Sequence, residues 1–209
     1  MKGYSETLAH PWHGISLGED APFVVNVFVE IVPTDMIKYE VDKESGHLKI
    51  DRPQKYSNIC PALYGFIPRT YCDQHVANYA MKRTGKTGVQ GDKDPIDICV
   101  LTQSPINHAA IILSARPTGG FRLFDQDEAD DKIVAILDKD PAYAHYDDIS
   151  QVPVGIIDRL RHYFLTYKQT PDTDFINHTP ACQISHVYGR QEAQEVIQAS
   201  LKDYEALCV

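Results

Sequence analysis

The sequence lacks several features that mark secreted, membrane-spanning and nucleic-acid-binding proteins. Its five cysteines are an odd number without a C-x-x-C pair, which argues against a disulfide framework and a structural zinc site. No apolar run approaches the roughly 20 residues that span a bilayer. No Lys/Arg-rich run occurs, and the net charge of -9 would repel a phosphate backbone. We therefore expect a cytoplasmic protein with neither nucleic acid nor membrane as a partner.

Histidine pairs and flexible linkers are also missing. The nine histidines show no H-x-x-x-H spacing that would indicate a nitrogen-ligated metal site. No internal repeat or Ser/Pro/Gly linker divides the 209 residues. We predict one domain over 1–209, with a core at about 23–205, an N-terminal extension at 1–22 and a polar, irregular loop insertion at 68–91.

Apolar alternation predicts the strands. The run 23–32 is apolar on both faces, as in a buried strand, which makes Glu30 an anomaly. Runs 36–42 and 47–52 flank K-E-S-G, which is typical of a hairpin turn. Three further strands are expected at 96–101, 110–116 and 132–137, with a sharp bend at Gly119-Gly120 between the last two.

The last third of the chain changes to a helical period. Apolar residues recur at helical spacing over 156–167, after Pro153, and again over 196–204. Strands followed by helices indicate an α+β fold dominated by β structure. We expect a small barrel of five or more strands with two or more flanking C-terminal helices.

An acidic cluster in the middle of the chain predicts a hard-cation site. Asp92, Asp94 and Asp97 lie within six residues, and oxygen-only ligands favour magnesium, manganese or calcium. A calcium loop counted from Asp92 fails, because Asp97 and Gln103 stand where Gly and Glu are required. The remaining alternative from these residues alone is a solvated turn.

A second acidic cluster ends in a lysine. If Asp125 ends one strand and Lys132 begins the next, Asp130 and Lys132 share one face. The other acidic residues of the cluster are then expected to be solvated turn residues. These are Asp127, Glu128 and Asp131.

Cations and tyrosines accompany the acids. Lys38 and Glu40 lie two apart on one strand face, and taken singly they predict only a surface ion pair. Arg52 follows Asp51 at the end of the hairpin, and Tyr167-Lys168 ends the first helix. Together, cations, phenols and carboxylates suit a metal ion plus a small polyanion, as in phosphoryl transfer.

These residues resemble the soluble family I inorganic pyrophosphatases. The resemblance runs, in the family's order, through seven segments from about 23 to 205. They are V-E-I-V-P (29–33), K-Y-E-V-D-K-E-S-G (38–46), D-R (51–52), Y-G-F-I-P (64–68), G-D-K-D-P-I-D (91–97), D-Q-D-E-A-D-D-K (125–132) and Y-K (167–168). The resemblance implies a five-stranded OB-type barrel, a homo-oligomer, and hydrolysis of pyrophosphate to two orthophosphates with three or four magnesium ions, manganese being possible.

The resemblance also implies residue roles. The metal ligands would be Asp92, Asp97, Asp125, Asp130 and Glu30, with Glu30 acting through water. The catalytic residues would be Asp94, as general base, with Asp97, Lys132 and Arg52. The phosphate-binding residues would be Lys38, Arg52, Tyr64, Lys132, Tyr167 and Lys168, supported by Glu40 and Asp51.

Two departures from the family stand out. Cys60 occupies a position that is often tyrosine, so one hydrogen bond near the site would be lost or supplied by another group. The 68–91 segment is long and carries Arg69, Lys82, Arg83 and Lys86. It would form either a basic flap over the site or a surface loop or subunit contact.

Two rival functions remain at the level of sequence. A magnesium-dependent hydrolase of nucleotides or other phosphate esters would need a base or sugar pocket, and no motif here supplies one. An OB-type nucleic-acid-binding module would need exposed aromatics and a positive field, against the charge of -9.

Overall fold

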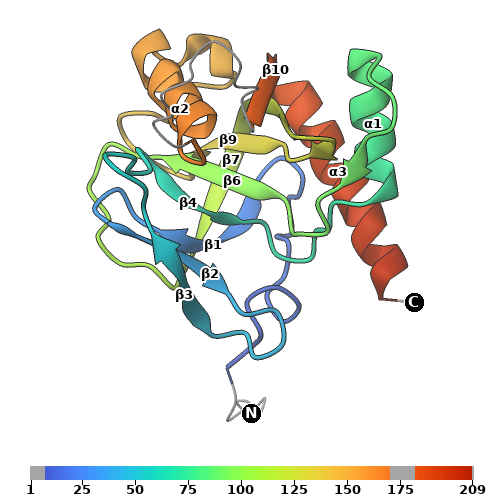
Figure 1. The fold of residues 1–209 in the computed structure, drawn as a ribbon. Coiled ribbons are helices and arrows are strands. Elements are labelled where there is room, and N and C mark those ends of the chain that lie inside the picture. Colours follow the sequence, from blue (N-terminus) through green and yellow to red (C-terminus); the bar gives the residue numbers. More distant parts are fainter. Residues whose placement is uncertain (1–7, 170–181, 209) are drawn as a thin grey trace.

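Five strands close into a barrel in the computed structural model, which describes residues 8–169 and 182–208. Their order around the ring is β1 (Val25–Ile31), β4 (Leu63–Phe66), β6 (Asp97–Leu101), β9 (Lys132–Leu137) and β7 (Ile111–Asp125), and β7 pairs back with β1. Neighbours are antiparallel except β6 and β9, which are parallel. The expected five-stranded barrel is confirmed (Figure 1).

Three further strands extend the sheet beyond the ring. β10 (Cys182–Gly189) pairs with β7, and β8 (Glu128–Ala129) connects β7 to β5 (Gln90–Gly91). Neither β4 nor β10 was predicted as a strand. β7 is the longest strand of the described residues, and it pairs with β1, β8, β9 and β10.

The barrel strands are apolar on both faces because each face meets its own hydrophobic cluster. Along β6 and β9, alternate residues enter different clusters. Ile98, Val100, Ile133 and Ala135 belong to the first, while Cys99, Leu101, Val134 and Ile136 belong to the second. This explains the near-continuous apolar runs that predicted these strands.

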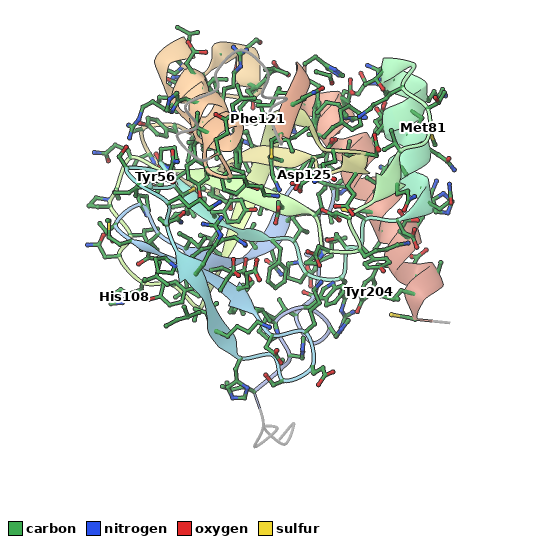
Figure 2. All side chains as sticks on the ribbon, in the orientation of Figure 1. Tyr56, Met81, His108, Phe121, Asp125 and Tyr204 are labelled. Atoms are coloured by element: carbon green, nitrogen blue, oxygen red, sulfur yellow. The ribbon has the colours of Figure 1, made fainter. Side chains whose placement is uncertain are left out.

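The helices cover two sides of the barrel (Figure 1). α2 (Val154–Thr166) begins after Pro153 and covers the second cluster, where the ring of Phe164 lies 6.1 Å from that of Phe121 of β7, labelled in Figure 2. A short 3₁₀ turn, η1 (Ile149–Gln151), precedes it. α3 (Arg190–Leu207) packs against β7 on the other side. Both expected C-terminal helices are confirmed.

Residues 68–91 are not the irregular loop that we expected. α1 (Gln74–Thr84) lies there and packs against α3, with only three small side chains buried. Its first turn is held by Asp203 of α3, which accepts hydrogen bonds from the N–H groups of Asp73, His75 and Val76. A polar helix with a narrow apolar stripe and a distant capping group gives little local sequence signal.

Gly119 and Gly120 do not form the bend expected between two strands, because they lie inside β7. A Cβ at Gly119 would lie 2.4 Å from the carbonyl oxygen of Tyr188, and one at Gly120 would lie 2.6 Å from the Tyr188 ring. The glycines therefore permit close approach of β10 to β7.

The hairpin of β2 (Ile37–Val41) and β3 (Leu48–Pro53) forms a separate two-stranded sheet, as predicted, with Gly46 at positive φ in its turn. The described part of the N-terminal segment packs on it. Trp12 is buried in a cluster with Val41, and His10 Nε2 lies 3.2 Å from the Lys43 carbonyl oxygen.

All five cysteines are free, in agreement with the expected lack of a disulfide framework. Within residues 8–169 and 182–208, no helix has the length and apolar character needed to cross a bilayer.

Candidate active site

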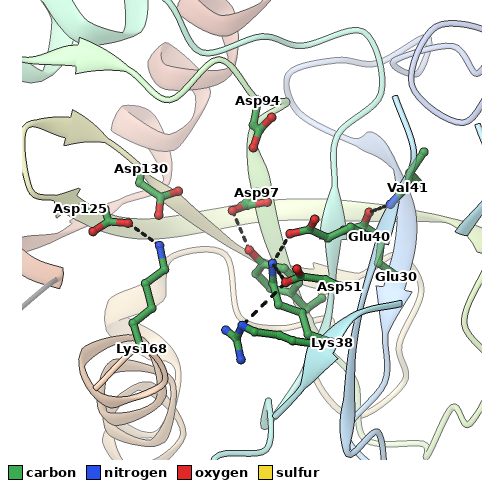
Figure 3. Close-up of polar contacts among 12 residues, drawn as sticks. Glu30, Lys38, Glu40, Val41, Asp51, Asp94, Asp97, Asp125, Asp130 and Lys168 are labelled. Carbon is green, nitrogen blue, oxygen red and sulfur yellow. Dashed lines mark hydrogen bonds and ion pairs between the residues drawn. The ribbon is translucent and has the colours of Figure 1, made fainter. Parts of the chain in front are cut away.

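A cavity of about 260 Å³ opens where the β2–β3 hairpin, the barrel and α2 meet. Its lining is strongly acidic, with eight carboxylates facing four lysines. The carboxylates are Glu30, Glu40, Asp92, Asp94, Asp97, Asp125, Glu128 and Asp130, and the lysines are Lys38, Lys43, Lys132 and Lys168. Most of the side chains that converge here are visible in Figure 3. The two acidic clusters of the sequence thus meet at one place.

Parallel pairing of β6 and β9 brings the two clusters together. Asp97 at the start of β6 lies in register with Lys132 at the start of β9. The Lys132 ammonium pairs with both Asp97 and Asp130, and it is only 2% exposed. The prediction that Asp130 and Lys132 act on one face is therefore confirmed.

Phenols and further cations lie among the carboxylates of the cavity. The Tyr64 hydroxyl donates a hydrogen bond to Asp97 at 2.6 Å. Lys168, just after α2, pairs with Asp125, and Tyr167 is buried beside it. On the hairpin, Lys38 pairs with Glu40 and lies 3.0 Å from Asp51 (Figure 3).

The crowded carboxylates resist ionisation. Burial raises the pKa of Asp92 well above its ordinary value, and the charge of Asp130 raises it further. Burial also raises the pKa of Asp130, although Lys132 opposes this effect. Burial disfavours the charged form of Lys132, but Asp130 and Asp97 outweigh it and raise its pKa. The site therefore holds more negative charge than its own lysines offset.

Glu30, the anomaly in β1, lies in this cavity and is 7% exposed. It accepts a 2.6 Å hydrogen bond from the Val41 N–H of the hairpin. Burial nevertheless raises its pKa to about 8. A buried carboxylate with a single such partner is suited to a nearby cation.

The donor set fits hard divalent cations, because it consists of oxygen ligands in excess of lysines. Among the described residues, no three His, Cys, Asp or Glu side chains already converge on one metal position. Lys132 lies between Asp97 and Asp130. An ion bound by both carboxylates would therefore have to replace the ammonium at one of them.

Some predicted site residues lie outside the cavity lining. Arg52 and Asp51 are on β3 beside it, with Arg52 Nε 3.7 Å from Asp51 Oδ2, and Arg52 is paired in register with Lys38. Cys60 is fully buried in the hydrophobic cluster under α2, together with Cys99 and Tyr163. Its thiol does not face the cavity, so it does not replace a phosphate-binding tyrosine hydroxyl.

The 68–91 segment contributes no residue to the cavity lining. Arg83 pairs instead with Glu192 of α3, and Lys86 lies 3.7 Å from Asp127. In this structure the segment supports α3 and does not cover the site as a flap.

The sequence interpretation did not assign several lining residues to the site, among them Lys43, Trp12 and Glu128. Lys43, in the hairpin turn, pairs with Asp94 at the mouth of the cavity. Trp12, from the N-terminal segment, also lines it. Lys43 belongs to the K-Y-E-V-D-K-E-S-G segment and could have been noticed there. No local signal marked Trp12.

One prediction in the second acidic cluster is wrong. Asp127 and Glu128 are exposed as expected, but Asp131 is 2% exposed. It pairs with Arg122 of β7 and accepts a hydrogen bond from Tyr188. Strand alternation places Asp131 opposite to Asp130 and Lys132, and that side of the strand is also covered by protein.

Comparison with known proteins identifies the family. The model of the family described as inorganic pyrophosphatase matches residues 27–205. The chain belongs to the inorganic pyrophosphatase family. An inorganic pyrophosphatase from Chlamydia trachomatis is 47% identical over 199 residues, which cover 95% of each chain. A soluble inorganic pyrophosphatase from Solanum tuberosum is 40% identical over 79% of this chain and 70% of its own.

Solved structures agree with this assignment. The inorganic pyrophosphatase from Thermus thermophilus superposes with a TM-score of 0.76 at 26% identity, covering 94% of this chain and 99% of that one. As a member of the inorganic pyrophosphatases, the chain is a hydrolase, and its reaction is the cleavage of pyrophosphate to two orthophosphates. The expectation drawn from the seven sequence segments is confirmed.

Proposed function

We propose that the acidic cavity carries out this hydrolysis with magnesium ions held by its carboxylates. The observation that supports the proposal is the excess of eight carboxylates over four lysines in one small cavity. Pyrophosphate is itself an anion, so it can enter such a site only if added cations reverse the local charge. Bound divalent ions would supply that charge and would lower the pKa of an attacking water.

The metal ligands that we propose are those implied by the family resemblance, and all of them lie in the cavity lining. Asp92, Asp97 and Asp130 would hold the first ion, Asp97 would be shared with the second, and Asp125 with Asp130 would serve the third. Glu30 acts through water, consistent with its burial behind the hairpin. Magnesium, with manganese as a substitute, suits this oxygen-only set.

Asp94 is proposed to take the proton from the attacking water. Its side chain is half-exposed at the cavity, whereas Asp130 is only 7% exposed. Asp94 pairs with Lys43, a cation of the protein itself, in addition to any metal ion nearby. An exposed, ionised carboxylate can accept a proton and pass it to solvent.

The cations and phenols are proposed to bind the phosphates. Lys38, Lys132 and Lys168 reach the cavity from three different elements, and they would neutralise the charge of the transferring phosphoryl group and the leaving phosphate. Tyr64 and Tyr167 would donate hydrogen bonds. Arg52 would reach the phosphate from β3, and Glu40 and Asp51 would hold Lys38 in place.

We further propose that the protein acts as a homo-oligomer in the cytoplasm. Free cysteines and the net charge of -9 are compatible with a reducing, aqueous compartment.

Orthophosphate release from pyrophosphate, measured with magnesium, with manganese and with a chelator, tests the proposal. We expect activity only when a divalent ion is present. A panel of nucleotides and phosphate monoesters should be hydrolysed far more slowly. Activity that is undiminished in chelator would contradict the metal assignment, and preferential hydrolysis of a nucleotide would contradict the substrate assignment.

A further inference from the structure

A second cluster of buried charges lies directly behind the proposed metal site. Its centre is Arg122 of β7, which is 0% exposed. Arg122 Nε lies 2.9 Å from Asp131 Oδ1, and Arg122 Nη2 lies 3.3 Å from Glu192 Oε1. The guanidinium carbon lies 5.2 Å from the ring centres of Tyr79 and of Tyr188. None of these residues has a role in the catalysis proposed above.

The cluster is continuous with the site through a single peptide segment. Asp131 stands between Asp130 and Lys132, which are proposed to bind metal and phosphate. It is anchored on the opposite face by Arg122 and by the Tyr188 hydroxyl at 3.0 Å. Since neighbouring residues share the backbone, holding Asp131 also holds the direction of the two side chains that flank it.

The other end of the cluster is tied to the helices. Glu192, in the first turn of α3, accepts a 2.5 Å hydrogen bond from Arg83 of α1 and lies 3.4 Å from His186 Nε2. Glu192 therefore contacts Arg122 from the helix side, about as directly as Asp131 contacts it from the strand side. The two carboxylates share one guanidinium but have different neighbours in sequence.

We propose that Asp131 is a positioning residue for the metal site: anchored by Arg122 and Tyr188, it fixes the strand entry that aims Asp130 and Lys132 into the cavity. The inference rests on the proposed function of Asp130 as a metal ligand. Residues that orient metal ligands from behind change metal affinity by about 10- to 100-fold when they are altered. Asp131 acts through Asp130 and does not touch the substrate.

The test compares Asp131→Asn with Glu192→Gln. Each variant replaces one carboxylate of Arg122 by its amide, so both should lower the melting temperature. Magnesium affinity, measured by titration calorimetry and by the magnesium-induced rise in melting temperature, should fall about tenfold in Asp131→Asn. It should change less than about twofold in Glu192→Gln, because no proposed ligand adjoins Glu192.

Tyr188→Phe provides a milder variant that removes only the hydroxyl, and we expect a two- to threefold loss of magnesium affinity, on the order of one hydrogen bond. Because Asp131 also aims Lys132, the Michaelis constant at saturating magnesium should rise in Asp131→Asn, and less in Tyr188→Phe, but should stay near that of the parent in Glu192→Gln. Equal shifts in Asp131→Asn and Glu192→Gln would overturn the inference and indicate general loosening. A parent protein that neither binds magnesium nor releases orthophosphate would instead overturn the proposed function.

Discussion

Two groups of charged side chains in this protein differ in the ratio of cations to carboxylates. Around Arg122, two arginines face two carboxylates, Asp131 and Glu192, so the numbers of cations and carboxylates are equal, although burial raises the pKa of Asp131 to about 6. In the cavity, eight carboxylates face four lysines, and the pKa values of Glu30 and Asp92 are raised by burial. Equal numbers of cations and carboxylates leave no net charge to be neutralised, whereas an excess of carboxylates favours the binding of added cations. The imbalance therefore distinguishes the proposed catalytic cluster from the cluster around Arg122.

The largest effect is expected at the unbalanced cluster. Asp94→Asn should lower kcat by about 10²- to 10⁴-fold, because the amide cannot accept the proton of the attacking water. Since Asp94 is half-exposed, the melting temperature of the variant should be nearly unchanged. Magnesium titration of the variant serves as the control and should match the parent. Normal turnover in Asp94→Asn would remove Asp94 from its role as base.

The balanced cluster should respond in stability. Arg122→Met leaves Asp131 and Glu192 without their shared cation, and breaking such a buried pair costs about 3–5 kcal/mol of unfolding free energy. Urea denaturation measures it. Arg161→Met, which affects an exposed pair with Asp158 on α2, is the matched control and should change stability little. Similar losses of unfolding free energy in the two variants would show that the pairs of Arg122 contribute no more to stability than an exposed pair.

The effect of pH sharpens the comparison. The pKa of Glu30 is raised from 4.5 to about 8 in the folded protein, so between these values the folded state binds a proton that the unfolded state does not. Without metal, stability should fall as pH rises through this window. Protons and cations compete for the same carboxylates, so the rise in melting temperature on adding magnesium should grow from about pH 5 to about pH 8. A magnesium effect independent of pH would contradict the cation requirement.

A substitution at Cys60 tests whether this position lies outside the cavity. Because its side chain is fully buried in the cluster under α2, Cys60→Tyr should overpack that cluster and destabilise the protein by about 1–3 kcal/mol. The Michaelis constant should stay unchanged, since the thiol does not face the cavity. Thermal unfolding and steady-state kinetics are the measurements. A lower Michaelis constant at unchanged stability would show instead that the tyrosine reaches the phosphate.

The smallest effect is a gain in stability that we expect only where carboxylates outnumber cations. Asp92→Asn removes one buried carboxylate whose ionised form is disfavoured by burial and by Asp130. The metal-free protein should gain about 0.5–2 kcal/mol of stability at neutral pH, as when strained functional sites are neutralised. Magnesium should then stabilise it less than the parent. Loss of stability in the metal-free variant would show that Asp92 is already balanced by a cation of the protein.

The sequence was a good guide wherever local patterns decide structure. Apolar alternation and helical period located β1, the hairpin, β6, β9, α2 and α3. Short charged segments located the two acidic clusters. Their meeting depends on parallel pairing of Asp97 with Lys132, which alternation alone does not predict. The family resemblance implied a common metal site for the two clusters, but not this pairing.

The misses share a physical cause, namely partners distant in sequence. Asp131 was predicted to be a turn residue because Arg122 and Tyr188, which contact it in the interior, lie on β7 and β10. α1 reads as a loop because its first turn is capped by Asp203, about 130 residues away. The sequence marked Cys60 as a departure from a tyrosine position, but nothing local showed that its side chain is buried under α2.

Closure of the barrel has a consequence for how the protein is made. β1 pairs with β7 through residues such as Val25 and Ala115, about 90 positions apart, and the catalytic residues extend from Glu30 to Lys168. Contacts of such long range form slowly and only after most of the chain is present. A nascent chain that ends before α2 therefore has its acidic residues without Lys168, and from the proposed role of Lys168 we expect activity only when synthesis of the domain is nearly complete.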